Sequence, residues 1–156
     1  MAVKPIPDGY HSVTPYLIMN DATAALEFYK KALGAVELMR MPAPGGKIGH
    51  AEIRIGDSPV MLADENPAMN ARSARTIGGS PISLMVYVED VDAVVARAVA
   101  AGGKLVRPVA DQFYGDRTGG VDDPFGYHWY IATHVEDVPP DELEKRAAKA
   151  MGGGAG

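Results

Sequence analysis

A histidine and a glutamate two positions apart are the side chains of this sequence best suited to acid–base or metal chemistry. His50 and Glu52 lie in Gly49-His-Ala-Glu-Ile-Arg-Ile-Gly-Asp57, which is typical of a strand, so they share one face of it. With His128 they would form a two-histidine, one-carboxylate metal set if the fold brought their strands together. The alternative is that these side chains make ordinary hydrogen bonds or contact solvent.

Arg117 is the second candidate, because it lies in the predicted hairpin that begins Tyr114-Gly-Asp-Arg117. Its planar guanidinium could hold a carboxylate or a phosphate with two parallel hydrogen bonds. The alternative is an ion pair with Asp116, Asp122 or Asp123 that orders the hairpin. The sequence leaves both interpretations open.

Composition argues against several other classes of protein. The 156 residues include no cysteine, which excludes disulfides and thiolate chemistry. The net charge of −5 disfavours nucleic acid and anionic membranes as partners. No apolar run approaches the roughly 18 residues of a membrane span, and the polar N-terminus does not resemble a signal peptide. No phosphate loop or nucleophile elbow is present. We therefore expect a cytoplasmic protein.

An internal repeat organises the elements that must position these side chains. A strand, an acidic turn, a helix with an apolar stripe, a glycine and a second strand occur in this order twice, at one offset of 69 positions. Three extended segments follow each helix, at about 35–42, 47–55 and 58–63 and at about 104–110, 117–122 and 127–133. The matched positions are Thr14 and Ser83, Asp21 and Asp90, and Gly34 and Gly103.

The pattern predicts an α+β fold of two tandem βαβββ modules. The first module covers residues 10–64 and the second covers residues 81–135. The polar, glycine-rich segment 65–80 between them is predicted to be a linker. Residues 136–156 are predicted to form a C-terminal helix and, from Gly152 on, a disordered tail.

Three parts of the sequence carry a resemblance to a known family. These are the helix from Asp21 to Tyr29 with its Glu-Phe-Tyr, the segment Gly49–Asp57, and the segment Asp116–Thr133 with its Asp-Pro-Phe-Gly hairpin. Together, over roughly residues 10–135, they resemble the vicinal oxygen chelate superfamily (glyoxalase, bleomycin resistance, dioxygenase), and most closely its PhnB-like branch. The resemblance implies that the two modules form a half-open, barrel-like sheet around a cavity. It also implies a homodimer.

Metal-dependent members of this superfamily hold Zn, Ni, Mn or Fe with four inward ligands from the first and last strands of each module. Carried over to this sequence, three of these positions fall on Thr14, Ser83 and Tyr130. The remaining position falls in the segment 59–63, which contains no residue of a type that binds metal ions. Hydroxyl groups are poor neutral ligands for a divalent ion. We therefore expect no metal or other cofactor at the usual site, and His50, Glu52 and His128 remain the alternative set.

If these positions face a cavity, residues two positions away on the same strands face it too. The expected wall combines hydroxyl, imidazole and aromatic groups, with Arg117 near its mouth. Such a wall could orient a small organic molecule by hydrogen bonds and cover its apolar surface. The predicted ligand-binding residues are Thr14, Tyr16, Ser83, Tyr87, Arg117, His128 and Tyr130.

Three functions remain open at this point. The first is a metal-free protein that binds a small organic molecule, as some bleomycin-resistance proteins do. The second is a metal-dependent lyase, isomerase or dioxygenase with a displaced metal site. The third is an assembly protein whose cavity is filled by its own side chains. The sequence does not decide whether this protein is an enzyme.

Overall fold

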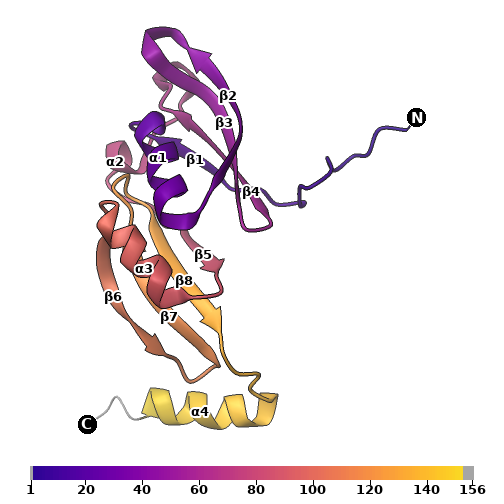
Figure 1. The fold of residues 1–156 in the computed structure, drawn as a ribbon, viewed down its shortest axis with the longest axis vertical. Coiled ribbons are helices and arrows are strands. Elements are labelled where there is room, and N and C mark those ends of the chain that lie inside the picture. Colours follow the sequence, from indigo (N-terminus) through magenta and orange to yellow (C-terminus); the bar gives the residue numbers. More distant parts are fainter. Residues whose placement is uncertain (1, 153–156) are drawn as a thin grey trace.

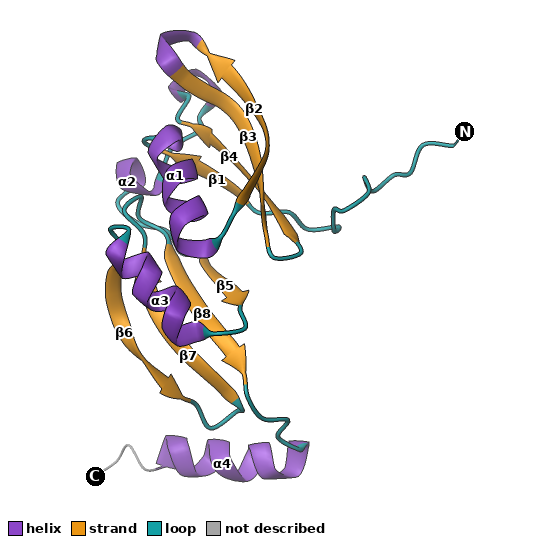
Figure 2. Ribbon diagram, viewed as in Figure 1, coloured by secondary structure: helices purple, strands orange, loops and turns teal. Residues whose placement is uncertain are grey.

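The computed structural model describes residues 2–152, which form two four-stranded sheets with a helix on one face of each (Figures 1 and 2). The strand orders are β1-β4-β3-β2 and β5-β8-β7-β6, and in each sheet the first two strands are parallel. The other neighbours are antiparallel. The predicted α+β fold is confirmed, and the two sheets remain separate and open. The disordered tail was predicted to begin at Gly152, but Gly152 is the last residue of the helix 140–152. The rest of the predicted tail, 153–156, lies outside the described residues.

Each module follows the order strand, helix and three strands, as the repeat predicts. Short helices join the modules between β4 and β5, within the segment predicted to be a linker, and a longer helix follows β8. The elements are β1 (Tyr16–Met19), α1 (Ala22–Leu33), β2 (Val36–Ala43), η1 (Pro44–Gly46), β3 (Lys47–Ile55), β4 (Ser58–Asp64), η2 (Pro67–Met69), α2 (Ala74–Ile77), β5 (Ser83–Tyr87), α3 (Val91–Ala100), β6 (Lys104–Asp111), β7 (Asp116–Asp122), β8 (His128–His134) and α4 (Pro140–Gly152).

The aspartates of the repeat begin the two long module helices. The Asp21 carboxylate accepts the backbone N–H of Ala24 at 3.0 Å, and Asp90 accepts that of Ala93 at 3.1 Å. Each aspartate therefore satisfies one of the amide groups that the first turn of a helix leaves free. Gly34 ends α1 with φ of 66°, a left-handed conformation that favours glycine.

An aromatic cluster joins the two modules where α1 meets the second sheet. The ring centroids of Phe28 and Phe125 are 6.2 Å apart, and those of Tyr29 and Trp129 are 5.4 Å apart. All four side chains are buried in one continuous apolar core that extends through both modules. This packing fixes the two sheets relative to each other, because edge and tilted contacts between buried rings stabilise one arrangement.

The C-terminal helix α4 lies at the far end of the second module, below the hairpin of β6 and β7 (Figure 1). Arg146 ties it to the preceding segment by hydrogen bonds to Glu136 of 2.8 and 3.0 Å. None of the residues of α4 is buried. Every helix within residues 2–152 is too short or too polar to cross a lipid bilayer.

Candidate functional site

Each sheet has one buried face and one open face. In β3, Ala51 and Ile53 are fully buried under α1, whereas His50 and Glu52 alternate with them and keep part of their surface accessible. Side chains alternate in this way because successive residues of a strand point to opposite faces. We call the face opposite the module helix the open face of each sheet. The predicted small-molecule residues lie mainly on these open faces.

A chain of four hydrogen-bonded side chains lies on the open face of the first sheet. The Tyr16 hydroxyl is 2.7 Å from Nδ1 of His50, and Nε2 of His50 is 3.1 Å from Oε2 of Glu52. Tyr10, which precedes β1, donates its hydroxyl to Oε1 of Glu52. An ionised carboxylate only accepts hydrogen bonds, so in neutral His50 the proton is on Nε2 and Nδ1 accepts from Tyr16.

Hydrogen bonding and burial shift the pKa values of Glu52 and Tyr16 in this chain. The hydrogen bonds from Tyr10 and His50 hold the pKa of Glu52 below its ordinary value, with Tyr10 the larger cause. Burial, and then the charge of Glu52, raise the pKa of Tyr16 above 10. Tyr16 therefore faces the open side as a neutral hydroxyl connected through His50 to a carboxylate. Such a chain could relay a proton.

His128 occupies the corresponding open face of the second sheet. Its Nδ1 is 2.7 Å from Oδ1 of Asp122, and its ring meets that of Tyr130 edge-on at a centroid distance of 4.4 Å. The Arg107 guanidinium lies over the Tyr130 ring, with its Cζ atom 5.8 Å from the ring centroid. Nε2 of His128 is buried and has no hydrogen-bond partner among residues 2–152. An unpartnered polar atom of this kind is one that a bound molecule could satisfy.

A second histidine lies on the same open face at the end of β8. Nδ1 of His134 is 2.7 Å from Oδ1 of Asp116, whose Oδ2 accepts the Tyr87 hydroxyl at 2.8 Å. Nε2 of His134 is 2.7 Å from Oδ1 of Asp137. Asp116, and then Asp137, raise the pKa of His134 above 6.5. Asp116 is buried, so it holds both His134 and Tyr87 in fixed orientations.

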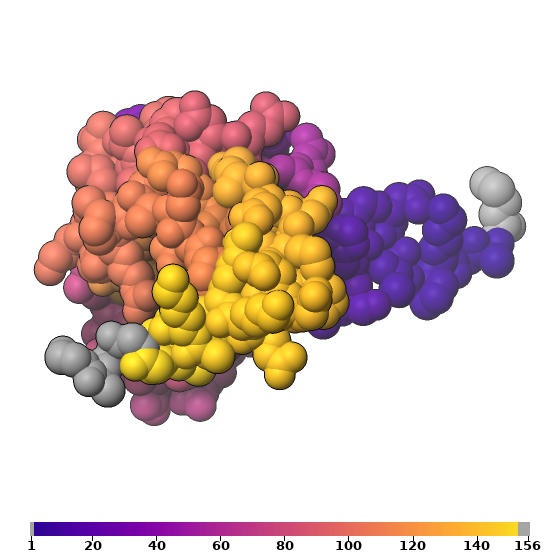
Figure 3. Space-filling view, turned by 90° about the horizontal axis from the view of Figure 1, so that it is seen from below, coloured from indigo at the N-terminus to yellow at the C-terminus, as the bar shows by residue number. Residues whose placement is uncertain are grey.

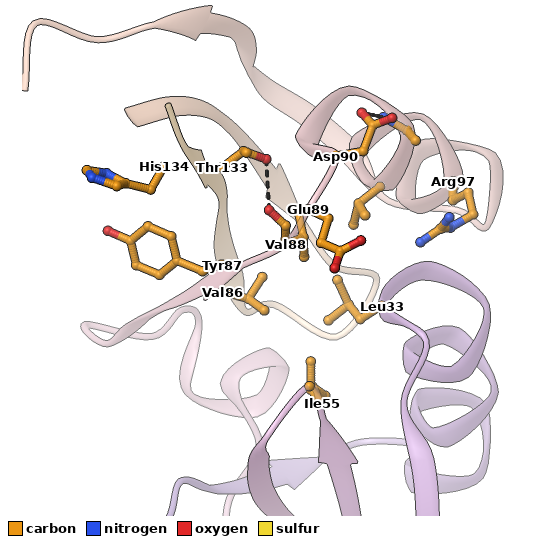
Figure 4. A pocket seen from close by; sticks show the side chains of 13 residues that line it. Leu33, Ile55, Val86, Tyr87, Val88, Glu89, Asp90, Arg97, Thr133 and His134 are labelled. Carbon is orange, nitrogen blue, oxygen red and sulfur yellow. Dashed lines mark hydrogen bonds between the residues drawn. The ribbon is translucent and has the colours of Figure 1, made fainter. Parts of the chain in front are cut away.

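Figure 4 shows a pocket of about 720 Å³ between the two modules, beside this cluster. Leu33 and Ile55 of the first module and Val86 of the second form an apolar floor. Tyr87 and His134 lie to one side of this floor in the view, Arg97 lies to the other, and Glu89 lies between them above Leu33. An apolar floor with polar groups at its rim is a common form of small-molecule site.

The structure divides the predicted ligand-binding residues between two sheets. Tyr16 lies in a pocket of about 470 Å³ on the first sheet, and Tyr87 lies in pockets between the modules. Thr14 precedes β1, which begins at Tyr16, and Ser83 is the first residue of β5. His128 and Tyr130 are neighbours on β8. None of the pockets described for one chain contains all seven residues.

Arg117 faces α3 and does not lie at the mouth of a cavity on the open face. Its Nε and Nη2 donate to the two carboxylate oxygens of Asp92 at 2.8 and 3.0 Å, and Nη1 donates to Asp111 at 3.2 Å. The alternative interpretation, an ion pair, is therefore observed, but with Asp92 and Asp111 in place of the three hairpin aspartates named for it. The physical reason is strand alternation, which puts Arg117 on the face opposite Asp116 and Thr118.

The three alternative metal ligands do not come together within residues 2–152 of one chain. His50 and Glu52 bond to each other on the first sheet, whereas His128 bonds to Asp122 on the second. Within residues 2–152 no group of three or more His, Asp or Glu side chains is placed to hold a metal ion. The alternative metal set is therefore not assembled in a single chain, and no reaction step can be derived through it.

The roles of three polar residues of the site were not predicted from the sequence. Asp122 and Asp116 each hold a histidine, and Tyr10 binds Glu52. The hairpin at 123–126 carried a usable signal for the aspartates, because a tight turn there places residue 122 opposite His128. No signal could have found Tyr10, because it lies outside any regular element.

Comparisons with known proteins agree with this architecture. A model of the Glyoxalase/Bleomycin resistance protein/Dioxygenase superfamily matches residues 9–131. The uncharacterised protein Rv0887c of Mycobacterium tuberculosis is 43% identical over 136 residues, which are 85% of this chain and 80% of that protein. The sequence likeness therefore covers both modules.

Solved structures show the same fold. TioX from Micromonospora sp. ML1 superposes with a TM-score of 0.63 and 28% identity, over 80% of this chain and 99% of that one. The PhnB protein from Bacillus cereus has a TM-score of 0.62 over 79% of this chain and 99% of that one. Its identity of 18% shows a common fold alone. The family match over residues 9–131 confirms the resemblance to the superfamily, and the solved structures add that the fold is shared.

Proposed function

Because this chain belongs to the Glyoxalase/Bleomycin resistance protein/Dioxygenase superfamily, we propose that it binds a small organic molecule between the open faces of its sheets. The binding species is a homodimer, and the binding itself needs no metal. The proposal includes the cytoplasmic location that the sequence favours. It concerns binding first, because membership of a superfamily does not fix a reaction.

The observation that carries the proposal is the accessibility of aromatic and methionine side chains on the open faces. Tyr87 is 60% exposed, and Tyr16 and Met85 are each 46% exposed. Hydroxyl and imidazole groups lie beside these apolar surfaces. Exposed apolar groups that adjoin fixed polar groups are typical of surfaces that bind another molecule.

A second copy supplies the opposite wall in this proposal. In the described part of one chain, no layer of secondary structure covers either open face. The first sheet offers Tyr16 and His50, and the second offers Tyr87 and His128. If the first sheet of one copy faces the second sheet of its partner, the predicted binding residues meet across a closed cavity. A two-fold dimer would contain two such cavities.

Proton transfer is a second candidate function, and the chain Tyr16–His50–Glu52 favours it. A bound substrate would transfer one proton to the Tyr16 hydroxyl oxygen as the original Tyr16 proton moves to Nδ1 of His50, which leaves a deprotonated substrate and an imidazolium. Glu52 would stabilise the imidazolium that forms. This arrangement suits isomerisation next to a carbonyl group. It requires the same cavity as the binding function.

The binding function can be tested with the fluorescent probe 8-anilinonaphthalene-1-sulfonate, whose emission rises in apolar cavities. We expect saturable binding to the folded wild type, weakened about tenfold or more in Tyr16→Ala and Met85→Ala, because each removes apolar contact area. Arg117→Ala is the matched control, since Arg117 faces α3, and it should bind like the wild type. Circular dichroism checks that each variant is folded.

Two results would contradict the binding function. Equal affinity in all variants would place the probe elsewhere on the molecule. No saturable binding by the probe or by a panel of small aromatic compounds would favour a protein whose faces are filled on assembly. The second candidate function, proton transfer, has its own assay. In heavy water the protein should replace the α-protons of simple ketones by deuterium, and Tyr16→Phe should abolish this exchange.

A further inference from the structure

A row of four residues crosses the open face of the second sheet. Arg107 of β6 pairs with Gly120 of β7, which pairs with Tyr130 of β8, and Tyr130 pairs with Met85 of β5. Side chains at paired positions of neighbouring strands point to the same face. The N-terminal segment extends away from the rest of the molecule, and α4 lies beyond the end of the second sheet (Figures 1 and 3). In one chain this row is therefore open to a ligand.

Gly120 provides the space that lets Arg107 lean across β7. A Cβ atom at Gly120 would lie 3.1 Å from Cβ of Arg107, 3.3 Å from its Cγ and 3.1 Å from Cε1 of His128. These distances are shorter than an ordinary van der Waals contact, so a larger residue would displace both side chains. The φ of Gly120 is not positive, so its backbone conformation does not favour glycine. The glycine serves the packing of Arg107 and His128.

The guanidinium of Arg107 has no acidic partner in the described part of the chain. Its Cζ lies 5.8 Å from the centroid of the Tyr130 ring, within the range of a cation–π contact. Arg40, Arg117 and Arg146 each pair with a carboxylate at 2.7 or 2.8 Å. Within residues 2–152 the side chain of Arg107 forms no such pair. A cation–π contact does not use the N–H donors of the guanidinium, so they are free to bind an anion.

Asp122, two positions from Gly120 on β7, shares this face with Arg107 but is already engaged. Its Oδ1 is 2.7 Å from Nδ1 of His128. Lys104 pairs with Asp122 across β6 and β7 and adds a second cation beside it. Although the chain carries a net charge of −5, the positive charge of Arg107 is therefore not neutralised by this aspartate.

We propose that the small molecule bound by this protein is an aromatic carboxylic acid, whose carboxylate pairs with Arg107 and whose ring lies over Met85 and Tyr87. The inference rests on the proposed binding function and specifies its ligand. A guanidinium presents parallel N–H groups that match the two oxygens of a carboxylate. Met85 and Tyr87 are 46% and 60% exposed, and they offer a polarizable and an aromatic surface to a flat ring.

The closed cavity of the homodimer strengthens this preference. When the open face of a second copy covers the row, the Arg107 guanidinium loses most of its contact with water. Enclosing an unpaired charge costs free energy, and a bound carboxylate offsets that cost through charge-assisted hydrogen bonds. A neutral ligand of the same shape leaves the charge unpaired. The site therefore selects acids over their neutral analogues.

Calorimetric titration of the full chain with two matched compounds tests the ligand class. 2-Naphthoate carries the carboxylate, and naphthalene-2-methanol has the same rings without the charge. We expect the wild type to bind 2-naphthoate about tenfold or more tightly than the alcohol. Arg107→Gln should remove this difference, and its affinity for the alcohol should change by less than about threefold. Arg72→Gln removes the same charge from an exposed arginine outside the row, so as the matched control it should bind both compounds like the wild type.

Gly120→Ala tests whether the position of Arg107 matters, because this variant retains the charge. The added methyl group should displace Arg107 and weaken the binding of 2-naphthoate more than that of the alcohol. Circular dichroism checks that the variant is folded. Should it not fold, Arg107→Lys takes its place, since it keeps the charge, loses the parallel donors and should also weaken the binding of 2-naphthoate.

The outcomes separate this inference from the proposed function. Equal affinity of the wild type for the two compounds, or a loss in Arg72→Gln as large as in Arg107→Gln, overturns the preference for acids and leaves small-molecule binding standing. The same holds if the wild type binds 8-anilinonaphthalene-1-sulfonate saturably but does not bind 2-naphthoate. A wild type that binds none of the three compounds overturns both.

Discussion

The hydroxyl of Tyr29 in α1 donates to Oδ2 of Asp123 in the β7–β8 hairpin at 2.5 Å, and so links the two modules across 94 positions of sequence. Asp123 also accepts the indole N–H of Trp129 at 2.9 Å and the backbone N–H groups of Phe125 and Tyr127, each at 2.9 Å. The same carboxylate therefore shapes the hairpin and holds the module interface. Both roles need a buried acceptor with several lone pairs.

Loss of the Asp123 carboxylate should destabilise the protein strongly. Asp123→Ala leaves four buried donors without an acceptor, so we expect the free energy of unfolding to fall by about 3 kcal/mol or more. Tyr29→Phe removes one donor and should cost about 1.5 kcal/mol. Urea denaturation measures both. Asp57→Ala is the control, since exposed Asp57 only binds Ser58, and a loss in Asp123→Ala no larger than in this control would contradict the link.

Local signals made much of the fold predictable from sequence. The repeat placed Asp21 and Asp90 before two helices, and both are observed as N-caps. The stripe of α1 that includes Phe28 and Tyr29 is buried, as its spacing predicted. These predictions succeed because capping and amphipathic spacing depend on residues within a few positions of each other.

The site was harder to predict because it depends on which strands are neighbours and on how the modules pack. Arg117 faces α3, so its partner Asp92 could not be chosen without knowing which side of β7 the helix covers. His50 and His128 lie on different sheets, and only the packing of the modules decides whether they meet. Sequence periodicity predicts which residues share one face of a strand, but it does not predict which strand lies beside it or which face a helix covers.

Two glycines with positive φ should respond differently to substitution. A Cβ at Gly115 would lie 2.1 Å from the Glu136 carbonyl oxygen, and φ there is 98°. At Gly34, with φ of 66°, a Cβ would meet no atom within 4 Å. Gly34→Ala should therefore cost only the backbone strain, about 1 kcal/mol, and Gly115→Ala about 3 kcal/mol or more. Thermal melting compares the variants, and equal losses would refute the close approach at Gly115.

His134 should make part of the stability depend on pH. Asp116 and Asp137 raise its folded pKa above the ordinary 6.5, so the folded state binds the proton more tightly than the unfolded state. The contribution is then fully present below about pH 6.5 and is lost as pH rises through the folded pKa. The difference in unfolding free energy between wild type and His134→Gln should shrink over this range.

Nuclear magnetic resonance titration of the imidazole Cε1–H supplies the matching measurement. The His134 pKa should lie above 6.5, and Asp116→Asn should lower it more than Asp137→Asn, since the hydrogen bond to Asp116 is the larger cause. Tyr87 shares Asp116 and can donate only while its hydroxyl is protonated. A stability difference that grows with pH would show that the ion pairs do not persist in solution.

Glu52→Gln should lower the pKa values of two tyrosines by different amounts. The hydrogen bond to Glu52 is the largest cause of the raised pKa of Tyr10, whereas burial is the largest cause for Tyr16 and the charge of Glu52 is second. Neutralising the carboxylate should therefore lower the Tyr10 pKa more than the Tyr16 pKa. Titration of ring-labelled tyrosine, assigned with Tyr10→Phe and Tyr16→Phe, follows each pKa separately.

Glu37→Gln is the matched control for Glu52→Gln, because Glu37 pairs with Arg40 and Lys30 instead. If the Tyr10 pKa did not move, residue 10 would not be held against the open face.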